Sequence, residues 1–263
     1  AWVPPTHRGR RTMDAYTSET YGEAYARVYD DWHGSLDEAT VERLSELAGG
    51  GRVLELGVGT GRVALPLAGR GLEVHGIDSS AAMVERLRAK PGGERVRVRA
   101  GDFAEADAPG EFALVYVVLN TFFMLTTQEA QARCFANVAR RLAPGGVFLI
   151  EAFVPDLTLY DRGQAVRVSD VQAGFVNLHV AQLDAASQRV SGQQIVIDAG
   201  GVRLYPIEIR FAWPSELDLM ARLAGMRLRE RWSGWRREPF DGRSQKHVSV
   251  YERADSRPAP AGP

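Results

Sequence analysis

Three glycines alternate with other residues directly after a short apolar run, a spacing typical of a loop that holds a nucleotide cofactor. The segment reads Val53-Leu54-Glu55-Leu56-Gly57-Val58-Gly59-Thr60-Gly61-Arg62. A buried strand that turns at once into a helix needs glycine at its tight turn and wherever a ligand approaches the backbone. The helix that follows supplies free N–H groups and the positive end of its dipole. We therefore predict a cofactor loop between a strand and a helix.

Polar residues follow the next predicted strands at the corresponding place. Asp78, Asp102 and Asn120 each come at a strand end, and Asp78 lies 21 residues beyond Gly57. The carboxyl ends of parallel strands form the edge where ligands bind, and an acid at the distance of Asp78 accepts ribose hydroxyls. Aspartates are also common caps and turn residues, so both acids have a purely structural alternative.

The glycine spacing distinguishes between two cofactors. The dinucleotide fingerprint G-x-G-x-x-G needs glycine three residues beyond Gly59, where this chain has Arg62. With Glu55 two residues before Gly57, the segment instead resembles motif I of class I S-adenosylmethionine (SAM) methyltransferases. Together with Asp78, Asp102 and Asn120, the resemblance extends over residues 20 to 155. It implies an enzyme that uses SAM and releases S-adenosylhomocysteine. The cofactor contacts expected on this basis are Tyr29, Glu55, Gly57, Gly59, Gly61, Arg62, Asp78, Ser79, Met83, Asp102, Phe103 and Leu119.

Strands and helices alternate along the middle of the chain, which indicates a parallel sheet with helices on both faces. We expect strands over 52–57, 72–77, 95–99, 112–118 and 146–153, and helices over 60–69, 80–90 and 127–142. Proline and glycine in residues 142–146 are typical of a helix end followed by a turn. With strands near 226–233 and 246–252, the pattern predicts an α/β, Rossmann-like fold with a seven-stranded, mostly parallel sheet.

The chain changes character after residue 155. Strand-like segments over 166–168, 175–183, 190–197 and 202–211 are separated by turn signals and predict an antiparallel insertion, followed by a helix from Pro214. We therefore expect one methyltransferase domain over 14–254, with a helical lid over 14–50 and a β-rich insertion over 156–213. Residues 1–13 are expected to be a disordered or tag segment, with Met13 a candidate start, and 255–263 a disordered tail.

Aromatic residues near the N-terminus fall mostly at spacings of four and three, on one stripe of a predicted helix. They are Tyr16, Tyr21, Tyr25, Tyr29 and Trp32. The stripe either packs on the body of the protein or covers a ligand. The segment Val28-Tyr29-Asp30-Asp31-Trp32-His33 and the insertion resemble those of small-molecule methyltransferases, among them N-methyltransferases of nucleotide-linked amino sugars in actinomycete natural-product pathways. There a Val-Tyr-Asp-x-aromatic-Tyr segment lies over the cofactor, and His33 replaces its last tyrosine.

A nitrogen or oxygen acceptor must lose a proton, and histidine titrates nearest neutral pH. The resemblance places His33 at an active-site position and Asn120 near the substrate, whereas a surface helix end is the alternative for His33. His247 shares a strand face with Ser249 and Tyr251, where a structural role is favoured. The catalytic candidates are thus His33, Asn120 and His247. No metal is expected, because the chain has no H-x-x-x-H or equivalent ligand spacing.

Composition excludes several classes of partner. A formal net charge of −1 and a pI of about 6.6 argue against nucleic acid and anionic membrane. The single cysteine, Cys134, allows no intramolecular disulfide and no cysteine-cluster metal site. No apolar run has the roughly 18 residues of a membrane span, and residues 1–12 lack a signal-peptide core, so we expect a cytoplasmic protein. The edges of the antiparallel insertion favour a homodimer.

The sequence therefore predicts a SAM-dependent methyltransferase acting on an oxygen or nitrogen of a small-molecule acceptor in specialised metabolism. A carbon acceptor and a SAM-binding module without turnover stay open as alternatives. A nucleic-acid methyltransferase is disfavoured by the charge and by Leu119-Asn120-Thr121-Phe122, which stands where such enzymes carry an Asn/Asp-Pro-Pro-aromatic motif. The residues leave the identity of the acceptor open.

Overall fold

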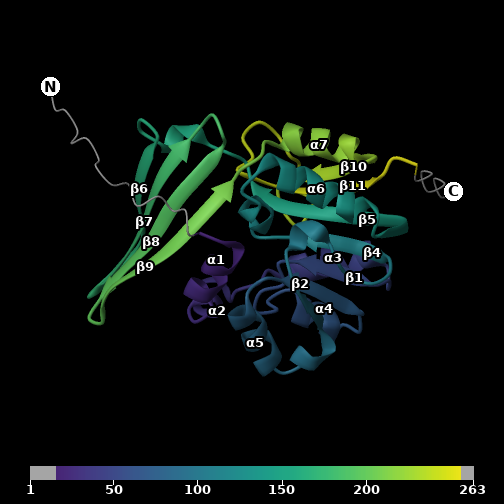
Figure 1. Cartoon of the computed structure of the whole chain (residues 1–263), viewed down its shortest axis with the longest axis horizontal. Helices are drawn as coiled ribbons and strands as arrows, with labels where there is room; N and C mark the ends of the chain where they lie inside the picture. The colour runs from purple at the N-terminus through teal and green to yellow at the C-terminus, as the bar shows by residue number, and fades with distance from the viewer. Residues whose placement is uncertain (1–15, 256–263) are drawn as a thin grey trace.

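The computed structural model describes residues 16–255, which form two sheets with helices around and between them (Figure 1). The larger sheet contains β1 (Val53–Leu56), β2 (Val74–Asp78), β3 (Arg97–Ala100), β4 (Phe112–Val117), β5 (Leu142–Phe153), β10 (Met226–Trp232) and β11 (Lys246–Arg253). Its strand order is β10-β11-β5-β4-β1-β2-β3. The strands β1 to β5 run parallel, and β11 pairs antiparallel with both β5 and β10. The predicted seven-stranded, mostly parallel sheet is confirmed.

Helices cover both faces of this sheet because its central strands are apolar on both sides. One face packs against α3 (Glu38–Ala48), α4 (Ala64–Gly69) and α5 (Ala81–Ala89), and the other against α6 (Gln128–Ala139) and α7 (Pro214–Leu223). Short 3-10 turns link the elements at Gly93–Arg95, Phe103–Glu105, Thr121–Met124 and Leu157–Leu159. None of the helices within residues 16–255 is long and apolar enough to span a membrane.

Two predicted boundaries around the sheet are wrong. The helix after the glycine loop begins only at Ala64, because the loop itself occupies the residues up to Val63. The predicted turn at 142–146 belongs to β5, whose pairing shifts register where Phe112 lies opposite Leu142 and Leu114 opposite Val147. The proline and glycines there form a bulged strand start rather than a free turn.

The expected single N-terminal helix is two short helices, α1 (Ser18–Tyr25) and α2 (Tyr29–His33), with a break at residues 26–28. Both lie between the two sheets (Figure 1). Tyr21 stacks on Tyr25 within α1, with ring centroids 4.1 Å apart, and Trp32 of α2 meets Tyr25 edge-on across the break. The aromatic cluster therefore extends across the break from α1 to α2.

The smaller sheet is an antiparallel meander of β6 (Gln164–Gln172), β7 (Phe175–Asp184), β8 (Arg189–Asp198) and β9 (Gly201–Arg210). It stands away from the larger sheet, with β9 nearest α1 (Figure 1). Its first strand is much longer than the predicted 166–168. The antiparallel element expected after β5 is therefore a separate four-stranded sheet.

Candidate active site

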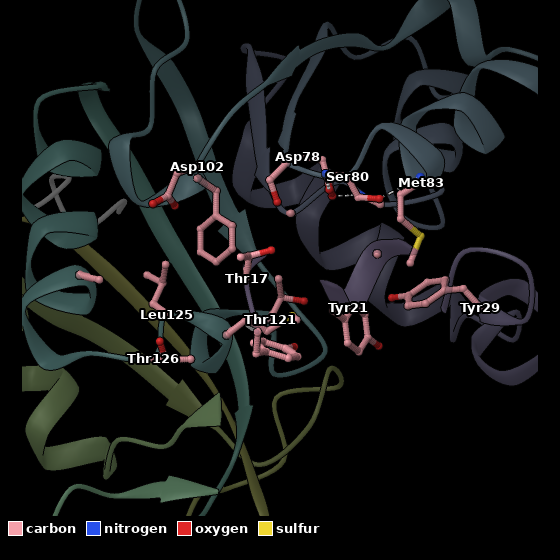
Figure 2. A pocket seen from close by; sticks show the side chains of 18 residues that line it. Thr17, Tyr21, Tyr29, Asp78, Ser80, Met83, Asp102, Thr121, Leu125 and Thr126 are labelled. Carbon is pink, nitrogen blue, oxygen red and sulfur yellow. Dashed lines mark hydrogen bonds between the residues drawn. The ribbon is translucent and has the colours of Figure 1, made fainter. Parts of the chain in front are cut away.

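A cavity of about 210 Å³ lies at the carboxyl ends of the parallel strands, beneath α1 and α2. Figure 2 shows Asp78 and Asp102 along one side of it, with Tyr21, Thr121 and Leu125 along the other. Eight of the twelve predicted cofactor contacts line this cavity: Tyr29, Gly57, Gly59, Asp78, Ser79, Met83, Asp102 and Phe103. The structure thus brings together residues from β1, β2, β3 and the lid.

The glycine loop is held by backbone bonds and leaves its outer side open. The Gly57 N–H donates to Ile77 O at 2.8 Å, and the Gly59 N–H donates to Asp78 Oδ2 at 2.7 Å. Gly57 has a φ of +74°, and a Cβ there would lie 2.5 Å from Thr121 Cγ2, so no other residue fits. A Cβ at Gly59 would meet nothing within 4 Å, which leaves this stretch accessible to a ligand.

The two acidic residues keep free acceptor positions. Asp78 accepts from Gly59 and, at 2.9 Å, from the Ser80 N–H, and burial raises the pKa of its carboxyl against these bonds. The Ser79 N–H also bonds to this carboxylate, and because a carboxylate offers about four acceptor sites, at least one stays free for a ribose hydroxyl. Asp102 accepts from the Ala104 N–H at 2.8 Å and is exposed to the cavity. Phe103 and Met83 add apolar surface, so the cavity fits the nucleoside part of SAM.

Three other predicted contacts support the loop from behind. Glu55 is buried and accepts a 2.7 Å bond from Tyr116 Oη, and burial raises the pKa of its carboxyl to about 8. Gly61, with a φ of +79°, packs against α5. The Arg62 guanidinium donates to His33 O and Ser35 O, both at 2.7 Å, and so binds the lid instead of facing the cavity.

The lid is fastened to the loop by Asp30, which the sequence pattern did not single out as a contact. Its carboxylate accepts from Thr60 Oγ1 at 2.6 Å and from Lys90 Nζ at 2.8 Å. Gly22 lets α1 approach the start of α5, because a Cβ there would lie 2.1 Å from Ser80 Cβ. A glycine inside a helix was the available sequence signal for this close approach.

A second cavity of about 1200 Å³ adjoins the first. The two share Tyr21, Tyr29, Thr121 and Met124 as lining residues. The larger one is enclosed by the lid helices, the end of β5 and one face of the smaller sheet. Its walls include the predicted residues His33, Leu119 and Asn120, and polar groups at Asp31, Asp156, Arg167, Asp170, Asn177, His179, Gln194 and Arg243. Burial lowers the pKa of both His33 and His179, so both rings are neutral near pH 7.

The Leu119–Asn120 turn in the wall of the larger cavity has an unusual backbone. Its residues have φ values of +54° and +63°, a region that costs a non-glycine residue about 1 kcal/mol or more. Glu151 holds the turn by accepting from the Leu119 N–H at 3.1 Å and from Trp235 Nε1 at 2.9 Å. Asn120 Oδ1 accepts from the Phe153 N–H at 2.7 Å. The Asn120 amide therefore anchors the turn as well as lining the cavity.

His247 lies outside both cavities as residues 16–255 form them. Its ring is buried beside Ser249, with Nδ1 2.8 Å from Oγ, and Ser249 also accepts a bond from Arg231. Arg231 pairs with Asp218, and burial lowers the pKa of His247 to about 3. The surroundings of His247 are those of a structural residue. Across the part of the chain that the structure describes, no three His, Cys, Asp or Glu residues are placed to hold a metal ion.

Comparisons with known proteins agree with this geometry. Residues 53–146 match the family model of a methyltransferase domain, which covers the glycine loop, Asp78 and Asp102. The solved structure of the CcbJ methyltransferase from Streptomyces caelestis is 38% identical, covers 91% of this chain and 100% of its own, and superposes with a TM-score of 0.86.

Two curated relatives extend the similarity. The cypemycin N-terminal methyltransferase of a Streptomyces species is 29% identical over 205 residues, which are 78% of this chain and 84% of that protein. The dTDP-4-amino-2,3,4,6-tetradeoxy-D-glucose N,N-dimethyltransferase of Saccharopolyspora spinosa is 29% identical over 146 residues, 52% of this chain and 57% of that protein.

Proposed function

The chain belongs to the SAM-dependent methyltransferases, and from this premise we propose that it methylates an amine nitrogen of a small polar acceptor. The family, the enzyme class and the cofactor predicted from the glycine loop are confirmed. SAM supplies a methyl group activated by its sulfonium. The chain's own residues bind the nucleoside, orient the acceptor and exclude water.

The observation that carries the proposal is the contact between the two cavities at Tyr21, Tyr29, Thr121 and Met124. Methyl transfer is an in-line displacement, so its rate depends on holding the two reacting atoms in contact and in line. A nucleoside in the smaller cavity and an acceptor in the larger one would meet at these shared residues. The lid, fastened through Asp30 and Arg62, closes the smaller cavity against solvent.

Polar groups in the larger cavity support an amine acceptor. Among the lining residues, the three acids Asp31, Asp156 and Asp170 outnumber Arg167 and Arg243, and this excess of negative charge attracts a protonated amine. An amine must lose its proton before it attacks, and the neutral ring of His33 is able to take it. The two curated relatives described above are named as an N-terminal methyltransferase and as the N,N-dimethyltransferase of an amino sugar. The net charge of −1 supports a small molecule over nucleic acid.

The test is methyl transfer to matched pairs of acceptors. Each pair consists of an amine and the corresponding alcohol, for example a nucleotide-linked amino sugar and its hydroxyl parent, incubated with isotopically labelled SAM. We expect labelled methyl only on the amine, detected by mass spectrometry. Methylation of the alcohol alone would overturn the choice of nitrogen. Methylation at carbon would overturn nitrogen and oxygen alike as the acceptor atom. SAM binding without transfer to any acceptor would favour a non-catalytic module.

A further inference from the structure

One face of the smaller sheet points away from the larger cavity. This face is apolar along the half that lies farther from the larger sheet, which we call the outer half. Cross-strand pairing places Val166 beside Val180, Val168 beside Leu178 and Val171 beside Val176. The same rows continue through Leu178, Ile195 and Leu204, and through Val176, Ile197 and Val202. We call these ten residues the outer apolar face: Val166, Val168, Val171, Val176, Leu178, Val180, Ile195, Ile197, Val202 and Leu204.

In the outer half of this sheet, the face that points to solvent is apolar and the face that points to the cavity carries polar residues, which is the reverse of the usual arrangement. An antiparallel sheet ordinarily turns its apolar side to the core and its polar side to water. Here the cavity side of the outer half carries Arg167, Asp170, Asn177, His179 and Gln194. Six residues of the outer apolar face are 40–71% exposed, and they are half of the large apolar side chains that are exposed within residues 16–255. Contiguous apolar surface of this kind marks an interaction site in a soluble protein.

We propose that a second copy of this chain covers the outer apolar face, the two faces packing against each other about a twofold axis. At about 30 Å² of apolar surface per carbon, the exposed parts of these ten side chains amount to roughly 500 Å². Two such faces bury about 1,000 Å², which is the lower limit for a specific protein interface. The pairing needs no other surface of the molecule.

Charge supports a second copy over other occupants. The outer apolar face itself bears no charged side chain, and the charges at its inner end are already paired. Glu208 pairs with Arg189 at 2.8 Å, and Arg210 pairs with Glu216 at 2.7 Å. A charged partner or an anionic membrane would find no complementary group there, whereas an identical apolar face is complementary to itself. Because the acceptor cavity lies on the opposite side of the sheet, pairing leaves it open.

Molar mass in solution tests the proposal, measured by light scattering and sedimentation equilibrium on the full chain. We expect the wild type to be a dimer at micromolar concentration. The double variant Val168→Glu/Leu204→Glu should raise the dimer dissociation constant at least about a hundredfold, since carboxylates would be buried without partners. Leu223→Glu is the matched control, because Leu223 is 84% exposed on α7, and it should leave the dimer intact. SAM affinity should be equal in all three proteins, which shows that they are folded.

Three outcomes would overturn the proposal. A wild type that stays monomeric up to high micromolar concentration leaves the face without a second copy. A dimer that the double variant does not weaken must use another surface. Flotation of a monomeric wild type with phosphatidylglycerol vesicles, lost in the double variant, would assign the face to a membrane surface instead.

Discussion

The Asp30 carboxylate accepts a 2.6 Å hydrogen bond from the Thr60 hydroxyl, and this contact joins the lid helix α2 to the glycine loop. Lys90 completes the junction by donating to Asp30 at 2.8 Å and to Thr60 O at 2.9 Å. The polar side of α2, which carries Asp30, therefore attaches the lid to the loop. Tyr29, on the same helix, is left to line both cavities.

Asp30→Asn should weaken SAM binding about three- to tenfold, because the junction is partly exposed and such ion pairs contribute about 1 kcal/mol. The turnover rate at saturating SAM should change little, since Asp30 does not line the cavity. Steady-state kinetics with SAM as the varied substrate measures both.

The adjacent residue supplies the control for Asp30. Asp31 lines only the larger cavity, so Asp31→Asn should raise the KM of the acceptor and leave that of SAM unchanged. Equal effects of the two substitutions on SAM would contradict a specific role of Asp30 in fastening the lid.

Gly22→Ala should raise the dissociation constant of SAM at least about tenfold. The new Cβ would lie 2.1 Å from Ser80 Cβ, so α1 has to move away from α5 and open the roof of the smaller cavity. The matched control is Gly69→Ala, where an added Cβ meets nothing within 4 Å. Calorimetric titration of both variants with SAM should separate them, and identical affinities would show that α1 is not part of the cofactor site.

Glu151→Gln should lower kcat about tenfold while leaving SAM affinity within about twofold of the wild type. An amide oxygen replaces the carboxylate that receives both the Leu119 N–H and Trp235 Nε1, and each lost bond to a charged group is worth about 1.5–3 kcal/mol. Trp235→Phe removes only one donor and should cost less in kcat. A larger effect of Trp235→Phe than of Glu151→Gln would contradict the role of Glu151 in holding the Leu119–Asn120 turn.

Burial of Glu55 predicts a stability that declines with rising pH. The folded-state pKa of about 8 exceeds the ordinary value of 4.5, so the folded state retains a proton that the unfolded state loses. The free energy of unfolding should therefore fall between pH 4.5 and about 8, by up to about 1.4 kcal/mol per pH unit.

Burial of His247 makes stability depend on pH in the opposite direction. It therefore limits the pH range in which the effect of Glu55 can be measured. Its folded-state pKa of about 3 lies below the ordinary 6.5, so its contribution is lost as pH falls below 6.5. Urea unfolding between pH 6.5 and 8 therefore isolates Glu55. Glu55→Gln should remove the decline seen in the wild type, and an unchanged slope would show that Glu55 is ionised in the folded protein.

Local patterns in the sequence predicted the parts of the site that lie next to strand ends. The glycine loop, Asp78 and Asp102 follow β1, β2 and β3, and parallel strands place their carboxyl ends at one edge. Those patterns also placed His247, Ser249 and Tyr251 on one strand face. Which helices cover that face depends on strand order, and β11 turns it to the core beneath α6 and α7.

Contacts between distant segments had no local signature. Arg62 was expected to face the cofactor, but its guanidinium finds the carbonyl groups of His33 and Ser35. The Asp30–Thr60 bond joins residues thirty positions apart. On the two sides of the break between α1 and α2, Gly22 packs against Ser80 and Trp32 packs against Tyr205. None of these contacts can be predicted until the tertiary arrangement of the segments is known.

The account rests most directly on Asp78, whose remaining acceptor capacity is assigned to the ribose of SAM. Calorimetric titration of the wild type, Asp78→Ala and the control Asp198→Ala with S-adenosylhomocysteine tests this assignment. Asp198 lines neither cavity. We predict one binding site per chain in the wild type and the control, with affinity at least about tenfold lower in a folded Asp78→Ala protein. Unchanged binding in Asp78→Ala, or none in the wild type, would contradict the account.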